Sequence, residues 1–375
     1  FRLLYLSPET LLNPRVWDCL CEPTLVINGL ILDEAHCLVQ WGDTFRPAYY
    51  RLGAVRPALL KMKPAGSRIA IAAFTATADP GAQQTIQRIL CLQQPQCFRL
   101  NPYRANLYLS IRMVCTPRQR RQYLLHALRA RSDQPGLVYV RTRQDSEDLA
   151  LWLANQGYRT AAYHAGLAAP ERRMIEQAWL ASELQFVVCT CAFGMGINKP
   201  DVRWVIHFHV PLLLSEYVQE IGRAGRDGLR SDAVALVSEP TGWLDPSDNQ
   251  RQRFFQRKLK AQRRAAQQLA TKLPPQGDIS TISRQFKDGA LALSWLQGSG
   301  QLHWQDPFHY VLSTSDRRVA LDKLDSQAAQ QMTAYLRTRQ CRWRYLLHSF
   351  GFIQAAEMMH CGHCDNCCRA RGRDI

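Results

Sequence analysis

Residues 29–36 read Gly29-Leu30-Ile31-Leu32-Asp33-Glu34-Ala35-His36. The apolar run from Leu30 to Leu32 predicts a short strand buried on both faces, and two carboxylates follow where it ends. Because ligands of an open parallel sheet bind beyond the carboxyl ends of its strands, these acids should face a ligand. We predict that Asp33 holds a Mg²⁺ that bridges nucleotide phosphates, that Glu34 activates the attacking water, and that His36 couples this site to the next segment. A bare Asp-Glu pair would favour a solvated acidic turn instead. The choice between a binding site and a solvated turn therefore depends on motifs elsewhere in the sequence.

The composition favours a polyanionic partner. The 375 residues suit two or three domains, and a hydrophobic content of 46% is ample for their cores. Lys and Arg number 47 against 31 acids, which gives a net charge of +16, and arginine predominates. Guanidinium groups match phosphate geometry, although a generally basic soluble protein is the alternative. With no membrane-length apolar run, we expect no membrane partner and a cytoplasmic protein, or a nuclear one if the source is eukaryotic.

The first part of the sequence predicts half of a strand–helix domain. Residues 1–6 resemble a strand and lack a methionine, so we expect the sequence to start partway through a domain. Another buried strand at 68–73 leads into Ala73-Phe74-Thr75-Ala76-Thr77-Ala78. The hydroxyls of Thr75 and Thr77 could hydrogen-bond the acids of the first stretch, whereas such a turn by itself is more often a helix cap, here for residues 79–90.

A second series of elements follows a boundary near Asn101. Strands are predicted at 137–140, 160–163, 186–190, 202–208 and 233–237, with helices at 144–156 and 170–181. Alternating strands and helices predict a doubly wound parallel sheet. The fold class is therefore α/β, with doubly wound parallel-sheet lobes at residues 1–100, the first being incomplete, and at 101–240.

Two motifs in the second lobe suggest phosphate chemistry. Gly194 and Gly196 let the backbone approach a ligand closely. Arg223 and Arg226 are three residues apart and flanked by glycines at the end of a predicted helix. Arginines that stabilise a transferring phosphoryl group accelerate the reaction by about 10³-fold or more. A glycine-capped helix with solvated arginines would explain either arginine alone, but it explains the pair poorly.

The last third of the chain predicts two small modules. Residues 250–272 are basic and helix-prone, which fits either a solvated connector or a phosphate-contacting helix. Helices at 278–286 and 289–296, followed by a hairpin around Asp306-Pro307, suggest a winged helix within residues 250–320, a pattern that other small α+β inserts share.

A cysteine cluster predicts a metal centre in residues 325–375. Cys361, Cys364 and Cys367 are spaced as Cys-x₂-Cys-x₂-Cys, and Cys341 lies twenty residues upstream. Four such thiolates can close a tetrahedral zinc site, with an iron–sulfur cluster as the main rival. The spare candidates are Cys368, His360 and His363.

Taken in order, these motifs resemble those of the RecQ family of DNA helicases within superfamily two. The matching segments are 3–9, 33–36, 40–47, 73–78, 163–167, 193–200 and 219–228. The resemblance covers about residues 1–240 and resumes in the cysteine module, where the family carries zinc. It implies that the two lobes are RecA-like and that the protein is a 3′-to-5′ helicase that hydrolyses ATP with Mg²⁺, acts on single-stranded and duplex DNA, and serves recombination and repair.

The resemblance also implies roles for individual residues. Besides Asp33, Glu34 and His36, the catalytic set is Gln219, Arg223 and Arg226, with Arg226 as the better arginine-finger candidate. Nucleotide contacts fall on Asp33, Thr75, Thr77, Gly194, Gly196 and Asp201. DNA contacts fall on Trp41, Phe45, Arg46, Phe193, Asn198 and Lys199. Stacking of bases on aromatic faces such as Trp41 contributes about 1–3 kcal/mol per base.

Two departures from the family pattern limit these expectations. No Gly-Lys pair occurs in the sequence, so the family's phosphate-binding loop is absent and we expect it upstream of Phe1. Residues 1–375 by themselves should therefore hydrolyse ATP poorly. The winged-helix candidate also precedes the cysteine module, whereas in the family it follows. A DNA-binding zinc and winged-helix protein without ATPase activity is the alternative from another class, and an RNA helicase is a third; no signal indicates an oligomeric state.

Overall fold

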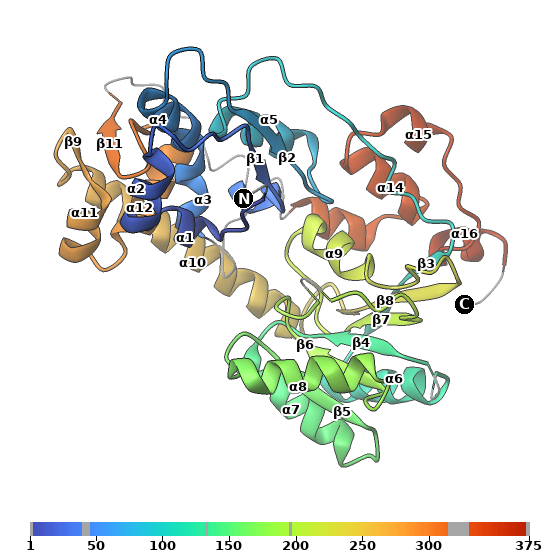
Figure 1. Ribbon diagram of the computed structural model, residues 1–375. Helices are drawn as coiled ribbons and strands as arrows, with labels where there is room; N and C mark the ends of the chain where they lie inside the picture. Colours follow the sequence, from blue (N-terminus) through green and yellow to red (C-terminus); the bar gives the residue numbers. More distant parts are fainter. Residues whose placement is uncertain (1–2, 40–45, 132–133, 195–196, 314–329, 373–375) are drawn as a thin grey trace. The chain divides into compact units, whose positions relative to one another are not determined.

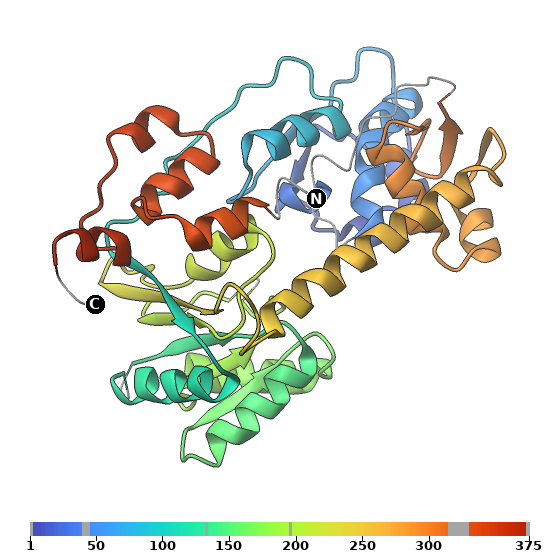
Figure 2. The same ribbon diagram turned by 180° about the vertical axis from the view of Figure 1, so that it is seen from behind.

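The computed structural model describes residues 3–39, 46–131, 134–194, 197–313 and 330–372 (Figures 1 and 2). The chain divides into two compact units, and each unit combines two separate stretches of sequence. Unit 1 comprises Phe1–Phe98 and Arg253–Asp325, and unit 2 comprises Arg99–Gln252 and Ser326–Ile375. Within these described ranges, no helix combines the length and the hydropathy that a membrane span requires.

Unit 2 is built on a six-stranded, fully parallel sheet. Its strand order is β3-β8-β7-β4-β6-β5. The strands are β3 (Leu107–Val114), β4 (Gly136–Tyr139), β5 (Thr160–Tyr163), β6 (Phe186–Cys189), β7 (Trp204–His207) and β8 (Ser231–Ser238). The helices of this part are α6 (Pro117–Arg129), α7 (Arg143–Ala154), α8 (Ala169–Leu180) and α9 (Leu214–Ile221). The predicted doubly wound lobe is confirmed, and β3 and α6 are additions that the sequence reasoning did not predict.

Alternate residues of each strand pack on opposite faces of this sheet. Leu137 and Tyr139 of β4 belong to the core that contains α8 and α9, whereas Val138 faces a second core formed with α6 and α7. The period of two residues in a strand explains this division. Because both faces are covered, the strands read as continuous apolar runs, which is why they were predictable.

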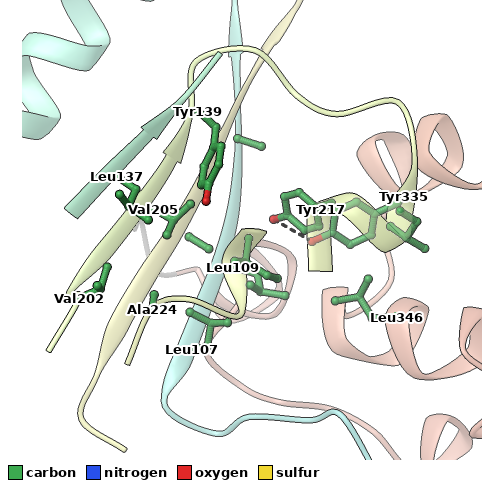
Figure 3. Close-up of a cluster of buried hydrophobic side chains, with 14 of the residues drawn as sticks. Leu107, Leu109, Leu137, Tyr139, Val202, Val205, Tyr217, Ala224, Tyr335 and Leu346 are labelled. Carbon is green, nitrogen blue, oxygen red and sulfur yellow. Dashed lines mark hydrogen bonds between the residues drawn. The ribbon is translucent and has the colours of Figure 1, made fainter. Parts of the chain in front are cut away.

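The cysteine module packs onto the same unit. It consists of a helical stretch at 330–337 followed by α14 (Arg342–Ser349), α15 (Ile353–Glu357) and α16 (Asp365–Ala370). Leu346 of α14 shares the core of Leu107 and Tyr217, and the hydroxyls of Tyr335 and Tyr217 are 3.3 Å apart (Figure 3). The module therefore continues the hydrophobic core beside α9.

Unit 1 contains a two-stranded parallel sheet, with β1 (Gly29–Leu32) beside β2 (Ala70–Ala73). Its other elements before residue 99 are α1 (Pro8–Leu11), α2 (Pro14–Cys21), η1 (Ala35–Leu38), α3 (Pro47–Arg51), η2 (Leu52–Ala54), α4 (Val55–Met62) and α5 (Pro80–Ile89). The prediction that β1 is buried on both faces is wrong, because Ile31 is 69% exposed. The described residues 3–6 are also not a strand. Both corrections have one reason, which is that burial and pairing of a strand come from neighbouring elements and not from its own sequence.

The insert module, residues 247–312, shares a core with the first part of unit 1, while the first six residues of its long helix belong to unit 2. It comprises α10 (Ser247–Ala270), β9 (Gln276–Asp278), α11 (Ile279–Gln285), α12 (Gly289–Gly298), β10 (Leu302–Trp304) and β11 (His309–Leu312). The strands form an antiparallel sheet in the order β10-β11-β9. Figures 1 and 2 show the insert (orange) beside the blue helices of residues 8–62, and the Gln297 amide donates to Tyr50 O at 2.8 Å.

Candidate functional site

The acidic motif lies where β1 and β2 end side by side. Phe74 N donates to Leu32 O, and Ala35 N donates to Phe74 O, each at 2.8 Å. These backbone bonds place the turn after β1 against the Thr-Ala-Thr turn after β2. Asp33 is exposed, and its Oδ1 accepts a hydrogen bond from Glu34 N at 2.9 Å. An exposed carboxylate at this edge is available to a cation.

His36 joins the two turns. Its Nδ1 lies 3.1 Å from Glu34 Oε2 and 3.3 Å from Thr75 Oγ1. Burial disfavours the charged ring, but hydrogen bonds to Cys37 and Glu34 outweigh this effect and raise the pKa of His36 to about 9. The Thr75 hydroxyl thus contacts His36, whereas the sequence analysis predicted hydrogen bonds from it to Asp33 and Glu34. Glu34 and Thr75 are linked through one imidazole ring.

Glu34 is held in a strained backbone conformation. Its φ of 50° and ψ of 44° lie in the left-handed region, which residues other than glycine, asparagine and aspartate seldom adopt. Such strain costs about 1–2 kcal/mol, and it persists only where the surrounding structure fixes the backbone. The turn therefore aims this carboxylate in one direction at the expense of local stability.

The arginine motif of unit 2 is packed against the glycine loop. Arg223 is buried, and its Nη1 donates to Gly194 O at 2.5 Å. Gly194 has a φ of +100°, and a Cβ there would lie 2.4 Å from Arg223 Nη1. Only glycine satisfies both constraints at this position. Arg223 thus holds the loop in place.

Arg226 is exposed and more loosely held. Its Nη1 donates to Asn198 Oδ1 at 3.2 Å and to Ile197 O at 3.4 Å. Partial burial and the nearby positive charge of Arg223 lower the pKa of Arg226. A guanidinium on the surface beside a like charge is positioned to meet an anion.

Two residues that sequence reasoning missed hold the turn between these arginines. Arg104 donates to the carbonyl oxygens of Gly222 and Gly225, and Asn106 Nδ2 donates to Gly225 O at 2.8 Å. Both lie about 120 positions upstream of the motif, in the segment that leads into β3. The available signal in the sequence is the boundary predicted near Asn101, which lies within five positions of both residues.

A buried ionic network supports the helix that carries the motif. Glu220 of α9 accepts hydrogen bonds from Arg141 Nη2 at 3.0 and 2.7 Å, and its Oε2 lies 2.8 Å from His207 Nε2. Burial would raise the pKa of Glu220, but the charge of Arg141 dominates and lowers it. Burial lowers the pKa of His207. The network fixes α9 to the carboxyl ends of β4 and β7.

The four predicted metal ligands come together in the cysteine module. The sulfur atoms of Cys341, Cys361, Cys364 and Cys367 all lie within 4.8 Å of one another, and Cys361 Sγ is 3.8 Å from Cys367 Sγ. Zinc–sulfur bonds of about 2.3 Å give a tetrahedron whose edges are about 3.8 Å. The donor set and the spacing therefore fit a Zn²⁺ ion.

Hydrogen bonds around the cluster suit thiolates. Cys361 N donates to Cys341 Sγ and Arg342 N donates to Cys364 Sγ, both at 3.4 Å. Hydrogen bonds with Cys361 and Cys364 lower the pKa of the Cys341 thiol. Backbone donors of this kind orient and stabilise metal-bound sulfur. Cys368 lies apart from the cluster, with its thiol toward Gly362 O.

The metal cluster is tied directly to the parallel sheet. Asp365 forms a buried ion pair with Arg342, and its Oδ2 accepts a hydrogen bond from Ile111 N of β3 at 3.0 Å. Trp343 Nε1 donates to Leu107 O of the same strand at 3.1 Å. Short polar contacts therefore fix the cysteine module to β3.

Several predicted site residues are placed differently from expectation. Phe193 is fully buried against the rings of Tyr163 and Trp179, so its face is not accessible to DNA. Lys199 is also buried, and its ammonium group donates to Ser182 Oγ at 3.1 Å.

The remaining predicted residues fall at the surface, in the core or outside the described ranges. Asp201 is exposed at the surface, and its Oδ1 lies 3.4 Å from Lys199 Nζ. Arg46 is exposed at the start of α3, and Gln219 is half-buried on α9. Thr77 is buried. The predicted positions Trp41, Phe45 and Gly196 lie outside the described residues.

Comparisons with known proteins agree with this arrangement. Residues 119–228 match the sequence-family model of the helicase conserved C-terminal domain, and residues 306–368 match the family model of the RecQ zinc-binding domain. The fold resembles a solved structure of S. cerevisiae Dbp5 bound to RNA and ADP BeF3, with a TM-score of 0.50, 18% identity and coverage of 65% of this chain and 61% of that one. At this identity the likeness concerns the fold alone.

Curated relatives cover most of the chain. The chain is 46% identical over 367 residues to ATP-dependent DNA helicase RecQ of Synechocystis sp., which covers 98% of this chain and 76% of that protein. It is 37% identical to RecQ of Pasteurella multocida over 65% of this chain and 37% of that protein. It is 35% identical to the probable ATP-dependent DNA helicase RecS of Bacillus subtilis over 63% of this chain and 46% of that protein. The chain belongs to the RecQ family of ATP-dependent DNA helicases.

Proposed function

We propose that this protein is an ATP-dependent DNA helicase that moves 3′ to 5′ on single strands, unwinds duplex DNA and acts in recombination and repair. The observation that carries the proposal is the strained, directed Glu34 linked through His36 to Thr75. The names of the curated relatives supply the substrate, DNA, and the nucleotide, ATP.

The residues at the two motifs divide the chemistry between them. Asp33 binds the Mg²⁺ that accompanies ATP, and Glu34 orients and deprotonates the attacking water. Arg226 stabilises the charge that develops on the γ-phosphate, and Arg223 keeps the glycine loop in place through Gly194. Gln219, Gly194 and Asp201 contribute to the nucleotide contacts. His36 couples the acidic motif to the turn that contains Thr75, because its ring contacts both Glu34 and Thr75.

DNA contacts and the metal complete the proposal. Trp41, Phe45, Arg46 and Asn198 contact single-stranded DNA, and Zn²⁺ at the four cysteines maintains the module that packs on β3. A protein that acts on genomic DNA works in the bacterial cytoplasm, or in the nucleus of a eukaryote. A DNA-binding protein without ATPase activity would have no use for the strain at Glu34, so the enzyme is favoured over that alternative.

The test is ATP hydrolysis by the complete gene product, measured with and without single-stranded DNA. A Glu34→Gln variant should retain ATP binding and lose hydrolysis by about 10³-fold, because the amide cannot accept a proton. Glu22→Gln, the same change at an exposed position of unit 1, should leave the rate unchanged.

Two results would contradict the proposal. One is a wild-type protein that binds DNA tightly but never hydrolyses ATP. The other is a Glu34→Gln variant that hydrolyses ATP at the wild-type rate.

A further inference from the structure

The insert module has the element order of a winged helix but does not present the usual recognition helix. Its order is helix, strand, two helices and two strands, from α10 to β11. In helix-turn-helix proteins the second helix of the pair enters the DNA groove. Here that helix is α12, which contains no charged residue, and its Leu293, Trp295 and Leu296 are buried in the core of unit 1. The module must therefore contact a nucleic acid through another surface, if at all.

A row of cations lies on the exposed side of α10. Arg253, Arg257, Lys260 and Arg264 are all exposed and follow one another at intervals of four, three and four residues. At 3.6 residues per turn these side chains fall within about 60° of the helix circumference, and the row is about 16 Å long. None of the four forms an ion pair with another described residue.

The row of cations does not stabilise α10. The sequence contains no Asp or Glu between Asp248 and Asp278, so none of the four cations of the row has an acidic residue within four positions along the chain. Like charges at i and i+4 destabilise a helix by about 0.2–0.5 kcal/mol per pair. A solvated helix would mix both signs of charge, whereas an uncompensated row suits a line of phosphates.

An exposed aromatic ring lies along one edge of the row. Phe254 is 69% exposed, and the neighbouring positions on that edge, Ala261 and Ala265, are exposed and small. A nucleic-acid strand can approach such small side chains closely. Cationic grooves combined with an exposed aromatic face are typical of surfaces that bind single strands, because bases stack on the ring.

We propose that this cationic face of α10, formed by Arg253, Phe254, Arg257, Lys260 and Arg264, binds single-stranded DNA. The four cations contact consecutive phosphates of one strand, and Phe254 stacks on a base. The proposal rests on the proposed function only for the choice of DNA among polyanions. It adds a DNA-contacting surface outside the two motor motifs.

The test is equilibrium binding of the full chain, without ATP, to a labelled single-stranded 20-mer and to a 20-base-pair duplex over a range of salt concentrations. The quadruple variant Arg253→Gln, Arg257→Gln, Lys260→Gln and Arg264→Gln removes the row and should not unfold α10, because it relieves repulsion. The matched control replaces four exposed arginines of unit 2 by glutamine, namely Arg118, Arg129, Arg159 and Arg173.

For the single strand, the slope of log K against log salt should fall by about 3 in the quadruple variant, since each lost phosphate contact contributes about 0.7. The control should keep the wild-type slope. Phe254→Ala should weaken binding of the single strand by about tenfold and leave duplex binding unchanged, because paired bases cannot stack on the ring.

Three results would overturn the proposal. Equal slopes for the quadruple variant and its control would show that the row makes no contact. A loss confined to the duplex would assign the row to double-stranded DNA. A wild-type chain that binds neither the single strand nor the duplex would refute the proposed function itself. That outcome differs from a wild-type chain that binds DNA equally well with and without the four cations.

Discussion

Arg223 and Arg226 are three residues apart, but the fold holds them in different ways. Arg223 is buried and bonded to Gly194 O, so its removal disturbs the packing of the glycine loop. Arg226 is exposed, and its two contacts to residues 197 and 198 are long. Only the second guanidinium can turn toward a phosphate without breaking a buried contact.

We therefore predict that Arg226→Ala lowers the DNA-stimulated rate of ATP hydrolysis by about 10³-fold and changes the free energy of unfolding by less than about 0.5 kcal/mol. Arg223→Ala should instead destabilise unit 2 by about 1–3 kcal/mol, because it leaves a buried carbonyl without its donor. Steady-state kinetics and denaturant unfolding of both variants separate these effects. Equal losses of stability in the two variants would contradict the assignment.

The two histidines at the end of β7 predict a loss of stability in acid. Burial lowers the pKa of His209 to about 4, despite its contact with Asp145, and burial also lowers the pKa of His207 beside Glu220 and Arg141. An unfolded histidine has a pKa of about 6.5 and therefore binds more protons between these values. Stability should fall as the pH decreases from about 6.5 toward 4, by on the order of 2–3 kcal/mol for His209.

Unfolding curves at pH 7 and pH 5 measure this dependence. His209→Gln should reduce the difference between the two curves. His126→Gln, which changes an exposed ring of α6, should leave the difference as it is in the wild type. A wild-type stability that rises in acid would contradict the sign of the prediction.

At the scale of elements, the sequence predicted those structures that its own periodicity determines. The apolar runs of β4 to β8 and the helical pattern of residues 278–286 are local signals, and the structure has these elements within a few residues. Pairing and burial depend on neighbours, which is why the exposed side of β1 was missed. The contacts of Arg104 and Asn106 with the arginine motif bring together residues about 120 positions apart, and no pattern in one sequence reports such a contact.

The cysteine spacing was a sufficient signal for the metal cluster, and it allows a matched test. Cys364→Ser should lose the bound zinc and destabilise unit 2 by several kcal/mol, because the cluster is tied to β3 through Asp365. Cys368→Ser should keep about one zinc per chain, since that thiol lies apart from the cluster. Metal analysis together with thermal unfolding checks both variants. Zinc loss in Cys368→Ser, or retention in Cys364→Ser, would contradict the ligand set.

The insert module should contribute to the stability of unit 1 through α12. Trp295 is buried in the core that joins the insert to Tyr50 and Leu59, whereas Trp243 is 90% exposed. Trp295→Ala should lower the free energy of unfolding by about 3–5 kcal/mol, and Trp243→Ala should change it by less than about 0.5 kcal/mol. Denaturant unfolding of the two variants measures the difference. Equal effects would mean that the insert does not share the core.

At the scale of the whole molecule, each unit is completed by a segment from later in the sequence. The insert supplies part of the core of unit 1, and the cysteine module extends the core of unit 2 beside α9. Sequence order alone suggested a row of four consecutive modules. The acidic motif and the arginine motif belong to different units, so hydrolysis as proposed requires both units to be intact.

The most direct test of the helicase assignment is strand displacement by the complete gene product in the presence of ATP and Mg²⁺. We predict that a labelled duplex with a 3′ single-stranded tail is unwound, that one with a 5′ tail is not, and that Glu34→Gln abolishes the reaction. Hydrolysis of ATP without displacement of either duplex would contradict the central claim and leave a DNA-dependent ATPase of another kind.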